Sequence, residues 1–268
     1  MRLRAVVIGT AIGVAAGVGV SRARRWWKSW GVDPGEAWKT LPGDDIVADP
    51  VAVDTRGITI DAPPSTVWPW LVQMGYGRAG WYSYDRLDQR GKSVEEIVDD
   101  WQSLAVGDIV PTHPTGGFEV AELDSGHALV LRSDTDLVMA QAAAASTAGT
   151  EDKGTAGVQV SGAMLGGTPQ DFSASWAFVL EPMDGGRTRL IERFRVWFGP
   201  AGPGRQLLAG PLLGFGVFVM MERQMRGIRD RAERLAATGG VPVTRVASAP
   251  EAGEATTEAP PEPVGIPG

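Results

Sequence analysis

The clearest hydrophobic pattern in the chain is a helical stripe near its C-terminal end. Apolar residues recur there at steps of three and four between Gly214 and Leu235. On the opposite face Glu222 precedes Arg226 by four residues, a charge pair that stabilises helices. The pattern predicts one long amphipathic helix. Its front part, residues 207–221, is apolar nearly all round. Because this part is short and interrupted by glycine and proline, we expect burial or the lining of a cavity mouth rather than a second membrane span.

Before this helix, apolar and polar residues alternate over several segments, as they do in half-buried strands. The links between the segments are short, and Pro182-Met-Asp-Gly-Gly has the composition of a hairpin loop. Consecutive strands with short links predict an antiparallel sheet. Strands are expected at residues 56–61, 108–112, 118–123, 128–132, 172–181 and 187–198.

Three short helices are expected between the first two strands. The first begins with Pro64 at its N1 position and is bent or shortened by Pro69. The second covers about residues 81–89. The third covers residues 93–101, where apolar side chains fall on one face at helical spacing.

The N-terminal end predicts a membrane anchor. Residues 5–20 form an uninterrupted run of apolar and weakly polar residues, which as a helix would rise about 24 Å. A hydrocarbon core is about 30 Å thick, so spanning it requires flanking arginines and the interfacial residues Trp26, Trp27 and Trp30. The alternative is a cleaved signal peptide, but the run is followed by a basic segment without a small-x-small cleavage site.

The charges around this run predict its orientation. Two basic residues precede it and four follow it, so the positive-inside rule places the folded domain in the cytoplasm, on a single-pass anchor in the cytoplasmic membrane. The absence of cysteine agrees with a reducing compartment. Gly9, Gly13 and Gly17 lie four residues apart and would form a groove in which two membrane helices could associate. The alternative is a run that is simply rich in glycine and alanine.

Composition shifts divide the rest of the chain. Segments dense in proline, glycine, alanine and threonine have little to bury and are typical of disorder. We expect a disordered insertion at about residues 140–170, in which residues 157–164 could add a short strand, and a disordered tail at residues 239–268. The predicted organisation is an anchor with its juxtamembrane segment at 1–30, a linker at 31–52 and one folded domain at 53–238.

Composition and motifs exclude several functional classes. A net charge of −7 and a sequence pI near 5.0 give no basic field for nucleic acid. With two histidines and no cysteine, neither a metal site nor a thiolate nucleophile is expected. Gly75-Tyr-Gly-Arg-Ala-Gly matches a dinucleotide fingerprint, but it follows a predicted helix where the fingerprint requires a strand. No cofactor is therefore predicted.

Six segments between residues 41 and 235 carry a recognisable set of motifs. They are Leu41-Pro-Gly-Asp-Asp, Ile58-Thr-Ile-Asp-Ala-Pro-Pro, Val67-Trp-Pro-Trp-Leu-Val-Gln-Met-Gly, Gly80-Trp-Tyr-Ser-Tyr-Asp, Trp101-Gln-Ser-Leu-Ala-Val-Gly-Asp and Met221-Glu-Arg-Gln-Met-Arg-Gly-Ile. Through these segments the chain resembles the START-like, or SRPBCC, superfamily. The similarity is greatest to uncharacterised, often membrane-anchored bacterial members labelled polyketide cyclase/dehydrase-like, and it covers about residues 41–235.

The resemblance implies a fold and a ligand class, but no reaction. The implied fold is α+β: a helix-grip, in which an antiparallel sheet wraps around a long C-terminal helix. Between them lies a cavity, and members of the superfamily use it to bind lipids, sterols or polyketides, on which some of them act. The group offers no agreed catalytic residues to carry over. This chain departs from it in the insertion at 140–170 and in Glu192 and Phe194.

Two acids are the candidates for chemistry. In the last strand Glu192 alternates with apolar residues on the core face, where burial would raise its pKa and suit it to proton transfer. The alternative is an acid paired with Arg132, His113 or Tyr84. Asp85 is the second candidate, although it could instead cap a helix or pair with a neighbouring arginine. The residues expected to line the cavity are Trp81, Tyr82, Tyr84, Arg132, Trp176, Phe178, Phe194, Phe218 and Met221.

Three functions remain open at this point. The first is a membrane-tethered carrier or sensor of a hydrophobic small molecule or lipid. The second is an enzyme of cyclase, dehydrase or isomerase type that uses Glu192 and Asp85 as acid and base. The third is a structural or protein-binding module whose aromatic side chains fill the core. A cavity with one paired acid favours the first, two facing unpaired acids favour the second, and a solid core favours the third.

Overall fold

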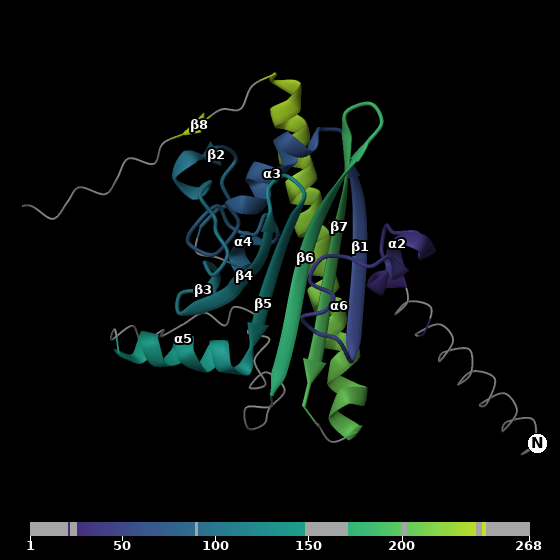
Figure 1. Cartoon of the computed structure of the whole chain (residues 1–268), viewed down its shortest axis with the longest axis vertical. Coiled ribbons are helices and arrows are strands. Elements are labelled where there is room, and N and C mark those ends of the chain that lie inside the picture. Colours follow the sequence, from purple (N-terminus) through teal and green to yellow (C-terminus); the bar gives the residue numbers. More distant parts are fainter. Residues whose placement is uncertain are drawn as a thin grey trace, which may run out of the picture.

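The computed structural model describes residues 21, 26–88, 91–147, 171–199, 203–239 and 243–244, and these form an α+β fold built on one large sheet (Figure 1). Six strands pair in the order β1-β7-β6-β5-β4-β3, and every neighbouring pair is antiparallel. Strands β2 (Ile97–Val98) and β8 (Val243–Thr244) form a separate short pair. The six strands are β1 (Ala52–Ile60), β3 (Ile109–His113), β4 (Gly116–Asp124), β5 (Ala128–Asp134), β6 (Phe172–Met183) and β7 (Arg187–Phe198).

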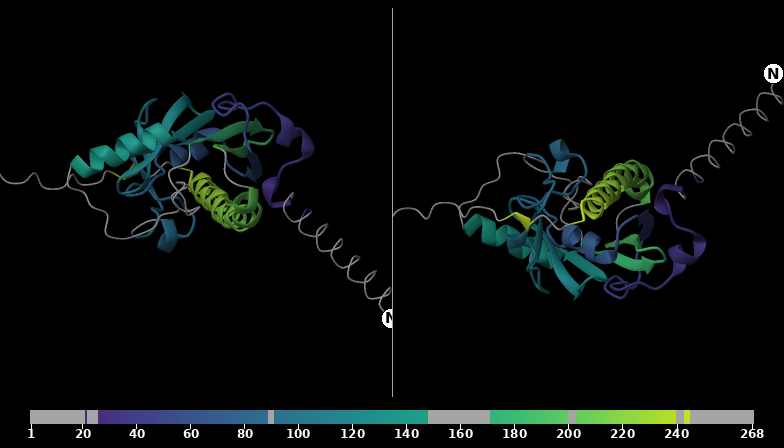
Figure 2. Two further views of the ribbon diagram at one scale, coloured as in Figure 1. Left: turned by 90° about the horizontal axis from the view of Figure 1, so that it is seen from below. Right: turned by 90° about the horizontal axis from the view of Figure 1, so that it is seen from above.

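One long helix, α6 (Pro203–Ala237), runs along one face of this sheet, which we call the inner face (Figure 2). Helix α3 (Pro64–Val72) packs beside it on the same face. This is the helix-grip arrangement that the hydrophobic pattern and the resemblance predict. The shorter helices are α2 (Pro34–Trp38), α4 (Asp85–Asp88), the 3-10 turn η1 (Asp99–Trp101) and α5 (Thr135–Thr147).

The main core lies between the inner face and these two helices. It forms because the stripe predicted on the C-terminal segment faces the inward side chains of the strands. Burial of such side chains stabilises the fold by about 1.5–3 kcal/mol each. The core includes Leu129 and Leu131 of β5, Phe178 and Leu180 of β6, Leu190 of β7, Met225 and Ile228 of α6, and Trp70 and Leu71 of α3.

The opposite, outer face of the sheet is covered by residues 33–48. This segment begins with a capping box between Asp33 and Glu36 at the start of α2. Further on, Leu41 packs with Ala128, Val179 and Ile191 in a second, small core. The sequence predicts a linker at residues 31–52, but in the structure this region includes a segment that packs on the sheet, because it covers apolar and arginine side chains that β7 turns outward.

Several segments that carry the family resemblance contact one another beside α6, through a hydrogen-bond network around Gln73. The side-chain amide of Gln73 donates to the Tyr82 hydroxyl (3.1 Å), and its oxygen accepts from Val98 N (3.0 Å) and Gln102 Nε2 (3.1 Å). Helix α6 approaches this network so closely that a Cβ on Gly227 would lie 2.1 Å from the Tyr82 carbonyl oxygen. These motifs therefore hold the loops against α6, and a larger residue at Gly227 would push them apart.

The strand predictions and the C-terminal helix are confirmed, with most boundaries shifted by a few residues. The α-helix predicted at 93–101 is wrong: only Asp99–Trp101 is helical, as the 3-10 turn η1. Tertiary hydrogen bonds hold the residues before it, since Val94 N donates to Ala79 O (3.0 Å) and Val98 N to Gln73. The helix predicted at 81–89 is reduced to the four residues of α4.

The predicted insertion needs a correction at its start. Residues 135–147 form helix α5, whose first turn is capped by Asp134, the acceptor from Leu137 N (2.8 Å). The alanine run that suggests a disordered segment is also a strong helix former. Residues 148–170, with the strand expected at 157–164, lie outside the described residues.

The predicted anchor at residues 5–20, with Gly9, Gly13 and Gly17, and most of the predicted tail at 239–268 also lie outside the described residues. Within the part that the structure describes, no helix combines the length and the apolarity needed to cross a bilayer.

Candidate functional site

The candidate site is built around Glu192 in the middle of β7. Its side chain turns inward, as the alternation of the strand predicts, and it is completely buried. One carboxylate oxygen, Oε1, accepts a hydrogen bond from the indole Nε1 of Trp176 (2.7 Å). The other oxygen, Oε2, is buried without a hydrogen-bond partner among the residues that the structure describes. Most buried polar atoms in folded proteins are paired, so a free carboxylate oxygen requires an explanation.

Burial raises the pKa of Glu192 from 4.5 to about 7. Loss of hydration disfavours the charged carboxylate, which is the main cause. The positive charge of Arg56 and the hydrogen bond from Trp176 act in the opposite direction, while the negative charge of Asp54 adds to the increase. Glu192 can therefore exist in either protonation state near neutral pH.

Arg56 is a second fully buried charged side chain on the inner face. It pairs with Glu192 in the β1–β7 register, but the two groups form no ion pair within 4 Å in the described residues. Its guanidinium instead donates to Met221 Sδ (2.8 Å), to Trp27 O (3.3 Å) and to Asp54 (3.1 Å). The strands thus place a positive charge beside Glu192 without occupying its free oxygen.

Asp54 continues this series of charges toward the surface. One of its oxygens binds Arg56, and the other lies 3.3 Å from Lys28 Nζ, within ion-pair distance although not aligned as a hydrogen bond. The charges alternate along the series, so the buried arginine is compensated by neighbours other than Glu192.

Aromatic rings surround the Trp176 indole that binds Glu192. Trp81 stacks on it with ring centroids 5.2 Å apart, and Phe178 lies at 5.1 Å. Phe118 and Phe194 meet it edge-on at 5.6 and 6.2 Å. The carboxyl group therefore lies beside a wall of five rings, which favours contact with apolar and aromatic molecules.

Several large side chains of the inner face are less buried at one end of the strands than at the other, although Phe172, Ala174 and Val196 at the less buried end form a small core of their own. At the hairpin end, Leu180 and Leu190 are completely buried under α3 and α6. Toward the opposite end, Phe194 and Phe198 of β7 and Phe118 of β4 point inward but are only partly buried. Glu192 lies at the boundary between these two zones, so a molecule entering from the partly exposed end would meet the aromatic rings first.

The structure brings together most of the residues predicted to line the site. Trp81, Trp176, Phe178 and Phe194 form the aromatic wall around the Glu192 contact. Phe218 and Met221 of α6 contact Arg56, since the Arg56 guanidinium lies 5.6 Å from the Phe218 ring.

Other predicted residues lie elsewhere. Asp85 accepts hydrogen bonds from the Ser93 amide (3.1 Å) and hydroxyl (2.6 Å), so it organises a loop. Arg132 is on the outer face, where it pairs with Glu119 (2.8 Å). Tyr84 is 41% exposed. The alternative that Arg132, His113 or Tyr84 pairs with Glu192 is wrong, because Trp176 supplies the hydrogen bond.

Tyr82 also has a structural role. Its hydroxyl donates to Trp70 O (3.1 Å), and the Arg231 guanidinium lies 4.8 Å from its ring. Burial raises the pKa of the Tyr82 hydroxyl above its ordinary value, so it remains a protonated donor. Its position in the network with Gln73 explains its burial without a ligand.

Sequence reasoning missed Arg56 and Asp54. A signal was present, because Arg56 alternates with Ile58 and Ile60 on one face of β1, as Glu192 does on β7. A charge at a core-facing strand position is rare enough to draw attention. The part of the chain that the structure describes contains no group of three or more histidine or acidic side chains placed to hold a metal ion.

Comparisons with known proteins find similar solved structures but no family. No family model and no curated protein matches the chain. Similar solved structures include a hypothetical protein from Helicobacter pylori (13% identity, TM-score 0.40, covering 72% of this chain and 95% of that one). Others are an Arthrobacter aurescens protein (12%, 0.37, covering 74% and 92%) and the Zhui aromatase/cyclase from a Streptomyces species (16%, 0.27, covering 71% and 99%). At these values the similarity carries no argument about function.

Proposed function

We propose that the chain is a membrane-tethered domain that binds a hydrophobic small molecule between the sheet and α6. The observation that carries the proposal is the free oxygen of Glu192, which is buried beside aromatic rings and has no hydrogen-bond partner within the described part of the chain. Leaving a buried carboxylate oxygen unpaired costs stability. A ligand that supplied the missing hydrogen bond would recover this free energy.

The free oxygen indicates the kind of polar group that the ligand carries. As a carboxylate, Glu192 can only accept a hydrogen bond, and as a carboxylic acid it can also donate one. With a pKa of about 7, both forms are available. A hydroxyl group is both donor and acceptor, so it can pair with either form. We therefore favour a hydroxyl-bearing hydrophobic molecule, such as a sterol-like or polyketide-like compound.

A second candidate is an enzyme of cyclase, dehydrase or isomerase type that works on the same ligand class. The pKa of Glu192 favours it, because a group that titrates near neutral pH is suited to general acid–base catalysis. The partner acid expected from the sequence does not support it, since Asp85 is held by Ser93. In this alternative Glu192 moves the proton alone.

The tether and the location are part of the proposal. They rest on the apolar run at residues 5–20 with its flanking arginines and on the greater number of basic residues after it. We propose a single-pass protein of the cytoplasmic membrane whose folded domain faces the cytoplasm. Self-association through Gly9, Gly13 and Gly17 would be an additional property of the same segment.

Native mass spectrometry of the full chain, released from lipid nanodiscs, tests the binding function. We use the full chain because residues 26–30 pack against α6. The expected result is a co-purifying small molecule with a hydrophobic skeleton and a hydroxyl group. If the chain carries no ligand and binds none from a panel of sterols, fatty alcohols and polyphenols, the aromatic side chains fill the core and the binding function is wrong.

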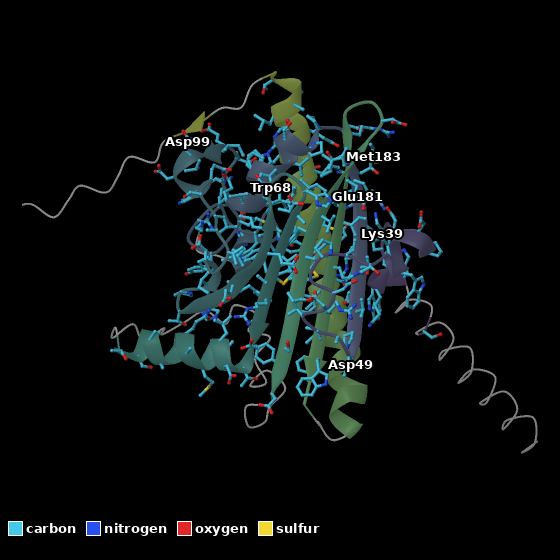
Figure 3. All side chains as sticks on the ribbon, viewed as in Figure 1. Lys39, Asp49, Trp68, Asp99, Glu181 and Met183 are labelled. Atoms are coloured by element: carbon cyan, nitrogen blue, oxygen red, sulfur yellow. The ribbon has the colours of Figure 1, made fainter. Side chains whose placement is uncertain are left out.

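The variant Glu192→Gln tests the assigned contact. In the variant, the amide oxygen takes the place of Oε1, because it can still accept from Trp176. The NH₂ group then takes the place of the free oxygen Oε2. Above pH 7 the ligand hydroxyl then exchanges a charge-assisted hydrogen bond to the carboxylate for a weaker one from a neutral amide. We expect about tenfold weaker binding there, equivalent to about 1.4 kcal/mol. Glu181→Gln is the matched control, because Glu181 lies near the hairpin and pairs with Lys39 on the outer side (Figure 3). Equal affinity of both variants would exclude Glu192 as the contact.

A further inference from the structure

Five aromatic side chains from two regions far apart in the sequence meet on one side of α6. We call Trp26, Trp27, Trp30, Phe215 and Phe218 the aromatic patch. Its rings contact one another edge-on: Trp26 and Phe218 at 5.3 Å, Trp27 and Phe215 at 5.5 Å, and Trp30 and Phe218 at 6.5 Å. The tryptophan segment that follows the predicted anchor is therefore attached to the domain.

The patch is buried on its inner side and open on its outer side. Phe218 is almost completely buried, whereas Trp26 is 58% exposed and Phe215 is 45% exposed. Two large exposed aromatic side chains in contact with the same buried ring form a continuous apolar surface, which marks an interaction site more often than scattered exposure does. Basic groups border it, since Lys28 lies between two of the tryptophans and Arg226 stacks 5.5 Å from the Trp30 ring.

We propose that the aromatic patch docks on the surface of an anionic lipid bilayer and orients the domain there. The partner follows from the chain itself: the apolar run at 5–20 ends six residues before Trp26, and three of the residues between them are arginines. Tryptophan prefers the membrane–water interface, and basic residues beside it bind anionic headgroups. The α6 segment around Phe215 has no charged residue from Leu207 to Met221, so it can approach lipid without burying a charge.

This orientation has a consequence for the proposed ligand site. The patch is linked to Glu192 through Arg56, which donates to Trp27 O and lies 5.6 Å from the Phe218 ring. The partly exposed end of the inner face is next to this link, because Phe194 pairs with Asp54 in the β1–β7 register and Asp54 pairs with Lys28. Docking would therefore direct the partly exposed end toward the bilayer, so that a hydrophobic ligand could exchange with lipid without crossing water.

The inference rests on the tether proposed above, and the absence of cysteine provides a clean test. Single cysteines at Trp26→Cys and Phe215→Cys give unique sites for an environment-sensitive fluorophore in the full chain. The matched control is Met183→Cys, an exposed apolar residue at the β6–β7 hairpin (Figure 3). Each labelled chain is placed in nanodiscs of phosphatidylcholine with phosphatidylglycerol, and its melting temperature is compared with that of the unlabelled protein.

Two quenchers distinguish the outcomes. We expect brominated lipids to quench the labels at 26 and 215 severalfold more than the label at 183, and iodide in the water to do the reverse. Equal iodide quenching at 215 and 183 would show that the patch faces water and would overturn docking. Protection from both quenchers would show that protein covers the patch, for example a second copy, and would also overturn it. A chain that separates from lipid on flotation would refute the tether itself, independently of ligand binding at Glu192.

Discussion

The two faces of β7 each carry a buried charged side chain, and the two side chains differ in how completely they are hydrogen-bonded. Arg193 on the outer face and Glu192 on the inner face are neighbours in the sequence, and both are buried. All five N–H groups of the Arg193 guanidinium are used: they donate to the Thr55 hydroxyl, to Asp44 and to the backbone carbonyls of residues 36, 37 and 39. Glu192 has one hydrogen bond and one oxygen without a partner in the described residues.

This difference separates a structural charge from one available for function. A buried charge whose hydrogen bonds are all made within the protein fixes the position of its partners, and here it holds residues 33–48 on the sheet. A buried charge with an unpaired atom costs stability and persists where something outside the protein can pair with it. The charge of Arg193 is therefore satisfied within the protein, whereas Glu192 keeps one oxygen available, as the ligand-binding function proposed above requires.

The largest loss of stability is expected when the buried charge of the outer face is removed. Arg193→Met leaves three backbone carbonyls without their donor and removes one partner of Asp44, which keeps Leu41 N and Arg195. We expect a loss of about 4 kcal/mol in the free energy of unfolding. Chemical denaturation measures it. The matched control is Arg187→Met on the exposed part of the same strand, for which we expect little change. A similar small loss for both variants would contradict the structural role.

The next effect is the pH dependence that Glu192 introduces. Its pKa is about 7 in the folded protein and has its ordinary value of 4.5 in the unfolded chain, so between these values the folded state holds a proton that the unfolded state releases. The contribution of Glu192 to stability is therefore complete below about pH 4.5 and decreases by about 3 kcal/mol as the pH rises past 7.

Glu192→Gln cannot titrate, so it isolates this contribution. We expect the difference in unfolding free energy, native protein minus variant, to decrease as the pH rises from about 4 to about 8. Denaturation curves at several pH values provide the measurement. A difference that stays constant over this range would mean that the pKa of Glu192 is the same in the folded and the unfolded protein.

The smallest expected effect is on the pKa of Glu192 when it loses the hydrogen bond from the Trp176 indole. Trp176→Phe keeps a ring but removes the donor that lowers the pKa of Glu192. We expect the pKa to increase by about one unit, equivalent to about 1.4 kcal/mol. The carboxyl band in infrared spectra, titrated against pH, reports it. Trp38→Phe is the control, because Trp38 is exposed on α2. No change in the Glu192 titration would show that the indole does not stabilise the carboxylate.

The site was partly predictable because strand alternation has a strict period of two. This period alone assigns Glu192 and Phe194 to the inner face, and the same rule applied to β1 would have found Arg56. Asp85 and Tyr82 stand out in the sequence by the local density of chemical groups, which says nothing about their partners. Ser93 and Gln73 engage them from other segments, and such pairings depend on how loops fold together.

Periodicity along the chain determined the sheet, the long helix and which side chains of β7 face the core, because these depend on local spacing and on the burial of apolar faces. Tertiary structure decided the rest. Only the register of the β6–β7 hairpin and the packing of its side chains show that Trp176, and not Arg132, meets Glu192. Only the packing of residues 26–30 on α6 brings Trp26 and Trp27 against Phe215 and Phe218. Such contacts give no periodic signal in the sequence, because they depend on how the whole core packs.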